Sequence, residues 1–174
     1  MFTFYRLLGK QGTQFYDGEF NQCPDLVELI LGPRVPDTLC VKVVRGKRPG
    51  DMMCPAFNVV SKRFIEVVQG CGATGFRACP IRVLQKQSSI PDYFLLKVTG
   101  CGGPVDESRS EVERGSDRLV MAYRGIYMDE SKWDGADLFS IPGMGIGTYL
   151  VRKVRDAIKD ARLLNVDLVE NSSP

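Results

Sequence analysis

A helix is the clearest element that the pattern of hydrophobic and polar positions predicts. It begins near Ser61, whose hydroxyl can cap the free N–H groups of a first turn, and continues to about Gln69. Its apolar residues recur at helical spacing and share one face; they are Phe64, Ile65, Val67 and Val68. Gly70 and Gly72 follow and suit the left-handed backbone that ends many helices.

Two strands are expected directly after this helix. Residues 80–86 and 93–98 are short hydrophobic runs, and the turn-forming sequence Gln-Ser-Ser-Ile-Pro-Asp lies between them at residues 87–92. We therefore predict that the two runs form a hairpin. A helix followed by a hairpin is typical of α+β proteins.

A second helix is predicted from Thr148 to Arg162. Thr148 can cap its first turn. The apolar positions of this stretch fall on one helical face and the charged positions fall outside it; the apolar residues are Leu150, Val154, Ala157, Ile158 and Ala161. Residues 164–170 then favour a closing strand.

Shorter elements are predicted elsewhere in the chain. Strands are expected at residues 2–8, 39–44, 118–127 and 138–141. Residues 20–35 suggest a short helix but fit a strand equally well, and residues 105–117 form a polar connection without apolar periodicity. The sequence thus predicts an α+β fold, with a mixed or mainly antiparallel sheet and two principal helices at about Ser61–Gln69 and Thr148–Arg162.

Length and composition favour one domain. The 174 residues are 44% hydrophobic and 25% charged, which is ordinary for a globular protein. We expect residues 1–174 to form a single domain, with an N-terminal strand and loops in 1–50, the core in 51–170 and a polar tail in 171–174. Because no apolar run approaches the roughly 20 residues of a membrane span and no signal-peptide pattern is present, we expect a soluble, cytoplasmic protein without a membrane partner.

Charge is distributed unevenly. The net charge of +2 is too small to indicate nucleic acid as a partner, but residues 106–137 hold nine acidic and five basic side chains. This block is typical of a solvated excursion, or alternatively of a surface that meets a basic protein. The second hypothesis places the partner contacts at Asp129, Glu130, Trp133, Asp134 and Asp137. Trp133 also fits a packing role, because an indole is more often a core anchor than a contact residue.

Candidate catalytic and metal chemistry is sparse. The chain has no histidine, the commonest general base and the usual partner of a nucleophilic serine or cysteine, so no catalytic residue is assigned. Six cysteines are present without a close pair of the C-x2-C type. We therefore expect free thiols and no metal site.

The turn from Gly143 to Thr148 is the one stretch that suggests a phosphate site. A glycine-rich turn before a helix can present N–H groups to a phosphate. However, Thr148 stands where the G-x-G-x-x-G pattern needs a glycine, and the Gly-Lys-Ser/Thr of a P-loop is missing. We expect a flexible loop here and no cofactor.

The chain resembles a known family in its apolar and turn pattern. Residues 55–61 (Pro-Ala-Phe-Asn-Val-Val-Ser), the helix to Gly70, Gly75-Phe76 leading to Pro80-Ile81, and residues 92–98 resemble the core of immunity-protein family eleven of bacterial polymorphic toxin systems. Residues 137–139 (Asp-Leu-Phe), the second helix and the final strand are similar to that family's ending. Ser140 and Asn165 depart from it, since the family often has a basic residue and a glycine there.

This resemblance implies an α+β protein that binds and neutralises a cognate toxin in the cytoplasm of the producing cell. It names no toxin. The alternative hypothesis is a small cytoplasmic enzyme or nucleotide-binding protein that uses the turn from Gly143 to Thr148. The binding hypothesis is favoured, because the sequence supplies an acidic segment and no catalytic set.

Overall fold

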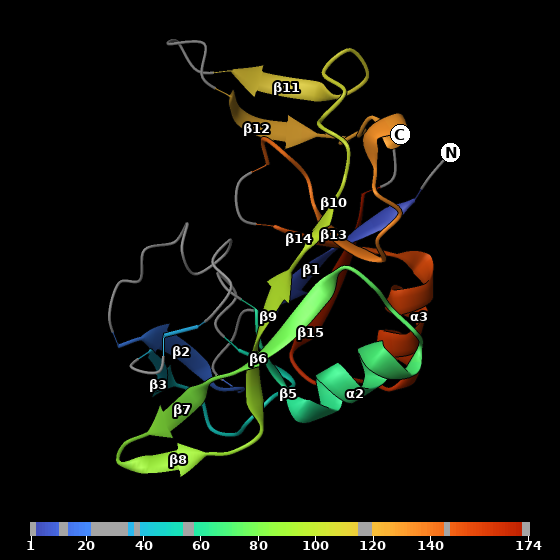
Figure 1. Ribbon diagram of the computed structural model, residues 1–174. Helices are drawn as coiled ribbons and strands as arrows, with labels where there is room; N and C mark the ends of the chain where they lie inside the picture. Colours follow the sequence, from blue (N-terminus) through green and yellow to red (C-terminus); the bar gives the residue numbers. More distant parts are fainter. Residues whose placement is uncertain are drawn as a thin grey trace.

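The computed structural model in Figure 1 describes residues 3–10, 14–21, 35–36, 39–53, 58–114, 120–144 and 147–171. The chain has the predicted α+β fold. Helices α2 (Lys62–Gly70) and α3 (Arg152–Asp160) accompany strands that form one five-stranded, two four-stranded and one two-stranded sheet in this described part. Pairing is mainly antiparallel, with parallel pairs at β3–β7 and β10–β13. No helix among the described residues is long and apolar enough to span a membrane.

The five-stranded sheet joins the two ends of the chain. Its strands, in spatial order, are β10 (Gly100–Cys101), β13 (Leu138–Ser140), β14 (Thr148–Val151), β1 (Phe4–Gly9) and β15 (Val166–Asn171). β1 lies between β14 and β15 and is antiparallel to both. The N-terminal strand is therefore an inner strand of the sheet.

Helices α2 and α3 lie side by side and cover one face of this sheet (Figure 1). Tyr5 and Leu7 of β1 point toward the helices, where Phe64 of α2 and Val154 of α3 pack with them in one buried cluster. Phe4 points to the opposite face and joins a second cluster with Phe139 and Tyr149. The sheet is thus covered on both faces along its middle strands.

Two further sheets enclose a third cluster. One contains β4 (Met52–Met53), β5 (Val59–Ser61), β9 (Tyr93–Val98) and β6 (Phe76–Pro80), and the other contains β2 (Asp17–Phe20), β3 (Cys40–Arg45), β7 (Arg82–Gln85) and β8 (Ser88–Ile90). Val41, Val59, Val83 and Leu95 pack between them. A two-stranded hairpin of β11 (Glu111–Arg114) and β12 (Val120–Arg124) stands apart from these sheets at the top of Figure 1.

The prediction of the first helix is confirmed. Ser61 caps α2, since its Oγ accepts a hydrogen bond from the backbone N–H of Phe64 at 3.1 Å. Phe64, Ile65 and Val68 are buried. Gly70 is the last helical residue, and Gly72 adopts the left-handed backbone (φ +66°) that turns the chain out of the helix.

The predicted start of the second helix is wrong. Thr148 does not cap a helix, because it belongs to β14 and its Oγ1 accepts a hydrogen bond from Asn58 Nδ2. α3 begins four residues later, at Arg152, and ends at Asp160. Thr148, Tyr149 and Leu150 are all buried, since each face of β14 packs on a different cluster. A strand buried on both faces shows no alternation, and its apolar residues then imitate a helical stripe.

The predicted hairpin of residues 80–86 with 93–98 is also wrong. β7 turns back at Lys86 and Gln87, where Lys86 adopts a left-handed backbone (φ +57°), and pairs with the short β8. β9 lies in the other sheet, between β5 and β6. Pairing of β9 with β5 and β6 therefore outweighs the hairpin that the turn at residues 87–92 would have formed.

The remaining strand predictions are largely confirmed. β1, β3, β12, β13 and β15 lie within or across the stretches predicted as strands. Residues 105–117 show no apolar periodicity and are predicted as a polar connection, but Glu111–Arg114 within them form β11 through backbone pairing with β12. The ambiguous helix or strand at residues 20–35 lies mostly outside the described residues, of which Phe20 ends β2.

Candidate functional site

The acidic segment singled out by the sequence precedes β13 and carries its own local order. Asp129 caps the short 3-10 helix η1 (Glu130–Lys132): its Oδ1 accepts the backbone N–H of Ser131 at 3.1 Å and the Ser131 hydroxyl at 2.6 Å. Lys132 Nζ lies 3.3 Å from the same carboxylate. The Ser131 hydrogen bond is the main cause that holds the pKa of Asp129 below its usual value. Asp129 is therefore a structural residue of this segment.

Asp134 links the segment to the edge of the five-stranded sheet. Its Oδ2 accepts the backbone N–H of Cys101 in β10 at 2.7 Å, and its Oδ1 accepts the N–H of Ala136 at 2.9 Å. The backbone N–H of Asp134 donates in turn to the carbonyl of Cys101 at 3.1 Å. Because this carboxylate satisfies two backbone donors, its removal would loosen the segment.

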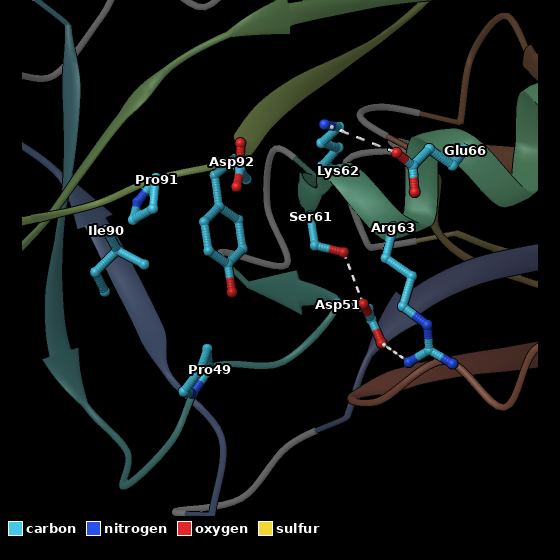
Figure 2. Close-up of a pocket in the computed structure, with 10 residues that line it drawn as sticks. Pro49, Asp51, Ser61, Lys62, Arg63, Glu66, Ile90, Pro91 and Asp92 are labelled. Carbon is cyan, nitrogen blue, oxygen red and sulfur yellow. Dashed lines mark hydrogen bonds and ion pairs between the residues drawn. The ribbon is translucent and has the colours of Figure 1, made fainter.

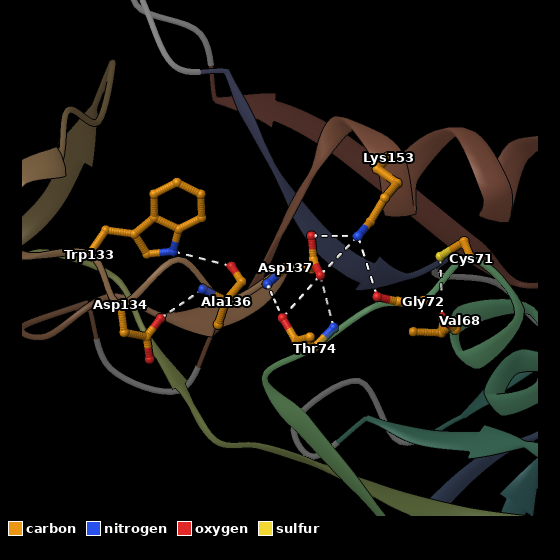
Figure 3. Close-up of polar contacts among 9 residues, drawn as sticks. All are labelled: Val68, Cys71, Gly72, Thr74, Trp133, Asp134, Ala136, Asp137 and Lys153. Atoms are coloured by element: carbon orange, nitrogen blue, oxygen red, sulfur yellow. Dashed lines mark hydrogen bonds and ion pairs between the residues drawn. The ribbon is translucent and has the colours of Figure 1, made fainter.

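Trp133 lies partly buried over the second face of the sheet. Its indole Nε1 donates to the carbonyl of Ala136 at 3.1 Å (Figure 3), and its ring centroid lies 5.9 Å from that of Phe139. The ring packs against the cluster of Phe4, Phe139 and Tyr149. The packing role expected for this tryptophan is confirmed, while its rim stays at the surface.

Asp137, directly before β13, bonds to the loop after α2 and to helix α3 (Figure 3). Its carboxylate accepts the backbone N–H of Thr74 at 2.9 Å, hydrogen-bonds the Thr74 hydroxyl at 3.0 Å and pairs with Lys153 Nζ of α3 at 3.0 Å. Lys153 Nζ also lies 3.4 Å from the carbonyl of Gly72, beyond the end of α2. Burial acts to raise the pKa of Asp137, but the hydrogen bonds from Lys153 and Thr74 outweigh it, so the pKa lies below its ordinary value.

Asp137→Asn should lower the free energy of unfolding by about 1–2 kcal/mol at pH 7. A depressed carboxyl pKa stabilises the fold above the unfolded pKa, and this contribution disappears as the pH falls through the folded pKa. The deficit of the variant should therefore shrink below about pH 4. Urea unfolding at pH 7 and pH 3 measures this change, with Asp160→Asn at the exposed end of α3 as control. An equal deficit at both values would contradict the assignment.

The structure also shows an open pocket of about 430 Å³ at the start of α2 (Figure 2), which the sequence did not reveal. It is lined by Pro49, Asp51, Ser61, Lys62, Arg63, Glu66, Ile90, Pro91, Asp92 and Tyr93. Burial, the charge of Asp51 and a neighbouring tyrosine raise the pKa of Tyr93 to about 12. Its hydroxyl thus stays protonated near neutral pH and donates to the carbonyl of Gly50 at 2.7 Å.

Asp51 lines this pocket and is buried. Its carboxylate accepts the Ser61 hydroxyl at 2.7 Å, the backbone N–H of Leu164 at 2.7 Å and Arg63 Nη1 at 3.2 Å. Arg63 also donates to the carbonyl of Ala161 beyond α3. These bonds hold both helices and the approach to β15 together, which is a structural role. The sequence analysis did not single out Asp51, because its partners lie 10 to 113 positions away along the chain.

The cysteines and the glycine-rich turn are the other features that the sequence raised as candidate chemistry. Among the described residues, no group of three His, Cys, Asp or Glu side chains is placed to hold a metal ion, and the thiols of Cys40, Cys71, Cys79 and Cys101 are free. The glycine-rich turn before Thr148 leads into β14 rather than into a helix. The helix N-terminus that a phosphate site would use is therefore four residues away, at Arg152.

The family comparison decides the broader assignment. The sequence matches the model of the Immunity protein family (Imm11) over residues 7–172, nearly the whole chain. The chain belongs to the Imm11 family. The family resemblance of the sequence pattern is thereby confirmed, and the α+β fold described above is that of an Imm11 protein. A comparison with curated proteins finds no match.

In this Imm11 protein the five residues expected at a partner surface lie along one continuous stretch. Asp129, Trp133 and Asp134 order that stretch, and Asp137 fastens its end to α3. Glu130 is exposed and lies on η1. The sequence identified the segment through its charge. The bonds from Asp134 to Cys101 and from Asp137 to Thr74 join residues more than 30 positions apart, so they left no local signal.

Proposed function

We propose that this protein is the immunity protein of a polymorphic toxin system and that it binds and neutralises a cognate toxin in the cytoplasm of the producing cell. Its membership of the Imm11 family carries this proposal. Inhibition by an immunity protein needs a surface and no reaction, which agrees with a chain that has no histidine. The contacts are proposed to include Asp129, Glu130, Trp133, Asp134 and Asp137.

The local order of this segment supports the proposal. Fixing a loop on association costs conformational entropy, and a loop that is already ordered avoids much of that cost. Asp129 and Asp134 hold the backbone through bonds to Ser131, Ala136 and Cys101. The surface presented to a partner is therefore largely preformed.

The chemistry of the exposed atoms also supports a partner surface at this segment. Trp133 offers the rim of an aromatic ring whose other side is anchored on Phe139, and tryptophan is enriched among residues that dominate binding energy. Glu130 lies beside it with an exposed carboxylate. Because the surrounding block is acidic, the complementary toxin surface is expected to be basic, and opposite charges accelerate encounter.

Two variants test this surface. The partner to use is the toxin encoded beside this gene, and calorimetry and surface binding kinetics give the affinity and rates. Glu130→Lys should lower the association rate, and Trp133→Ala should weaken affinity by roughly 10-fold to 100-fold through faster dissociation. Asp129 and Asp134 are unsuitable for reversal, because their carboxylates hold backbone N–H groups.

Asp160→Lys is the matched control for Glu130→Lys, since it makes the same charge change at an exposed position of α3. Trp133→Phe controls for lost packing against Phe139. If all variants bind the toxin as the unaltered protein does, the contact surface lies elsewhere. If the unaltered protein neither binds the toxin nor protects cells from it, the proposed function itself is wrong.

A further inference from the structure

β15 is the outer strand of the five-stranded sheet among the described residues, with β1 on its inner side. The two strands pair in antiparallel register without a shift, from Phe4 opposite Asn171 to Gly9 opposite Val166. β15 also contains no proline and no lysine, two residues that commonly prevent the edge of a sheet from pairing. Its outer side is therefore a regular edge to which another strand can pair.

The hydrogen-bond pattern of β15 determines which of its backbone groups face outward. The backbone N–H of Lys10 donates to the carbonyl of Asn165 at 3.3 Å, directly beyond the last strand pair and in the same register. In an antiparallel pair every second residue directs both of its backbone groups at the partner strand. The odd-numbered residues of β15 therefore face β1, whereas Leu168 and Glu170 direct their N–H and C=O groups away from the sheet.

The contacts at this edge agree with that pattern. The N–H of Leu168 donates to Oδ1 of its neighbour Asp167 at 3.1 Å. The carbonyl of Leu168 and both backbone groups of Glu170 form no hydrogen bond with the described residues. Asp167 and Glu170 are exposed, and Val169 between them is 44% exposed. The edge is thus accessible, and a carboxylate lies where the carbonyl of an added strand would accept.

Charge selects the kind of strand that fits this edge. Asp167 and Glu170 are acidic, β15 has no basic residue, and neither carboxylate forms an ion pair with the described residues. Arg155 of α3 interacts electrostatically with Glu170, but its guanidinium pairs with Asp156 at 2.6 Å. A second copy of the chain would bring four carboxylates onto two adjacent strands. A basic strand would instead place opposite charges across the pair, which is stabilising.

We propose that a basic strand of the toxin pairs with the outer edge of β15 and extends the five-stranded sheet; this rests on the proposed function. Backbone hydrogen bonds to Leu168 and Glu170 supply affinity that does not depend on the side chains of the toxin. Basic side chains opposite Asp167 and Glu170 supply the preference for this partner. When the strands pair, Asp167 releases the N–H of Leu168 to a toxin carbonyl, and its carboxylate becomes free to meet a basic side chain.

The edge lies near the acidic segment, so one toxin can contact both. Asn171, at the end of β15, lies opposite Phe4. The ring of Phe4 contacts that of Phe139 at 5.9 Å between centroids, and Phe139 contacts Trp133 at 5.9 Å. A standard interface of roughly 800 Å² per partner is wide enough to span two such ring contacts. The exposed rim of Trp133 and the edge of β15 therefore fit within one surface.

Amide hydrogen exchange tests the strand pairing directly. NMR would follow the free protein and its complex with the toxin encoded beside this gene. The N–H of Glu170 points to solvent, so it should exchange quickly in the free protein and roughly 100-fold more slowly in the complex. The N–H of Val169 is the internal control, since it faces β1 and should be protected in both states. Unchanged exchange at Glu170 in the toxin complex would overturn the inference.

Two variants separate backbone pairing from charge. Glu170→Pro removes an N–H that β1 does not use, and toxin affinity should fall roughly 10-fold below that of Glu170→Gln, which removes the charge alone. Asp167→Lys should also weaken affinity roughly 10-fold, mainly through slower association. Asp160→Lys makes the same charge change on α3 and should leave affinity unchanged. Circular dichroism and melting temperature verify that each variant is folded.

The outcomes distinguish this inference from the proposed function. Unchanged affinity in Glu170→Pro and Asp167→Lys, alongside weakened binding in Trp133→Ala, would overturn the edge pairing and leave the proposed function standing. A dimer of the unaltered protein that Glu170→Pro dissociates, measured by sedimentation, would show that a second copy occupies the edge and would also overturn it. Absence of toxin binding by the unaltered protein would overturn both.

Discussion

Replacing Asp51 by alanine should lower the free energy of unfolding by about 2–3 kcal/mol, because it removes a buried carboxylate that accepts three hydrogen bonds. Asp51 is 6% exposed and receives hydrogen bonds from Ser61, Leu164 and Arg63. Its loss leaves the backbone N–H of Leu164 without an acceptor, and it frees Arg63 from the carboxylate that positions it. The cap of α2 and the turn before β15 should therefore loosen together.

Chemical unfolding followed by circular dichroism at pH 7 measures this loss. Asp51→Asn keeps one oxygen, which can accept the backbone N–H of Leu164, while its amide nitrogen can donate to the Ser61 hydroxyl. It removes the negative charge that pairs with Arg63, so it should lose less than the alanine variant. Asp167→Ala is the control at an exposed position of β15, where changes usually stay within about 0.5 kcal/mol. A loss below about 1 kcal/mol for Asp51→Ala would show that the network contributes little.

Local information in the sequence was sufficient for α2. The cap at Ser61, the stripe of Phe64, Ile65 and Val68 and the left-handed Gly72 all lie within twelve residues of one another. Each acts on its own neighbours through backbone hydrogen bonds or burial, so the pattern and the structure agree. The same holds for β1 and β3, whose composition and length are typical of strands.

Predictions from local sequence failed where a residue's contacts come from distant parts of the chain. Thr148 could cap a helix by its chemistry, but Asn58 occupies its hydroxyl, and β1 pairs with the whole of β14. The sequence pattern pairs residues 93–98 with residues 80–86, but residues 93–98 form β9, which lies between β5 and β6. In each case hydrogen bonds across the sheet outweigh the local preference.

For the candidate site, too, the local features could be predicted from the sequence and the long-range contacts could not. A local excess of acidic residues made the segment from Asp129 to Asp137 visible in the sequence. Its attachment was not visible, because Asp134 binds Cys101 and Asp137 binds Thr74 and Lys153.

β10 and β13 pass close to each other where the segment from Asp129 to Asp137 joins the edge of the five-stranded sheet. Gly100 of β10 lies opposite Phe139 of the parallel β13. A Cβ at Gly100 would lie under 3.0 Å from the carbonyl oxygen of Leu138 and from Cβ of Ala136. Backbone atoms cannot swing aside as the end of a long side chain can. Any side chain here therefore forces the two strands apart.

Gly100→Ala should consequently cost about 3 kcal/mol of unfolding free energy, the upper part of the usual range for overpacking. Separation of the strands also strains the bond from Cys101 N–H to Asp134, so toxin affinity should fall in the same variant. Gly70→Ala is the matched control. Gly70 is the last residue of α2 and a Cβ there would have no atom within 4 Å, so alanine should raise the free energy of unfolding by about 0.5–1 kcal/mol. Thermal and urea unfolding compare the two, and a Gly100→Ala variant as stable as the unaltered protein would show that the strands yield without cost.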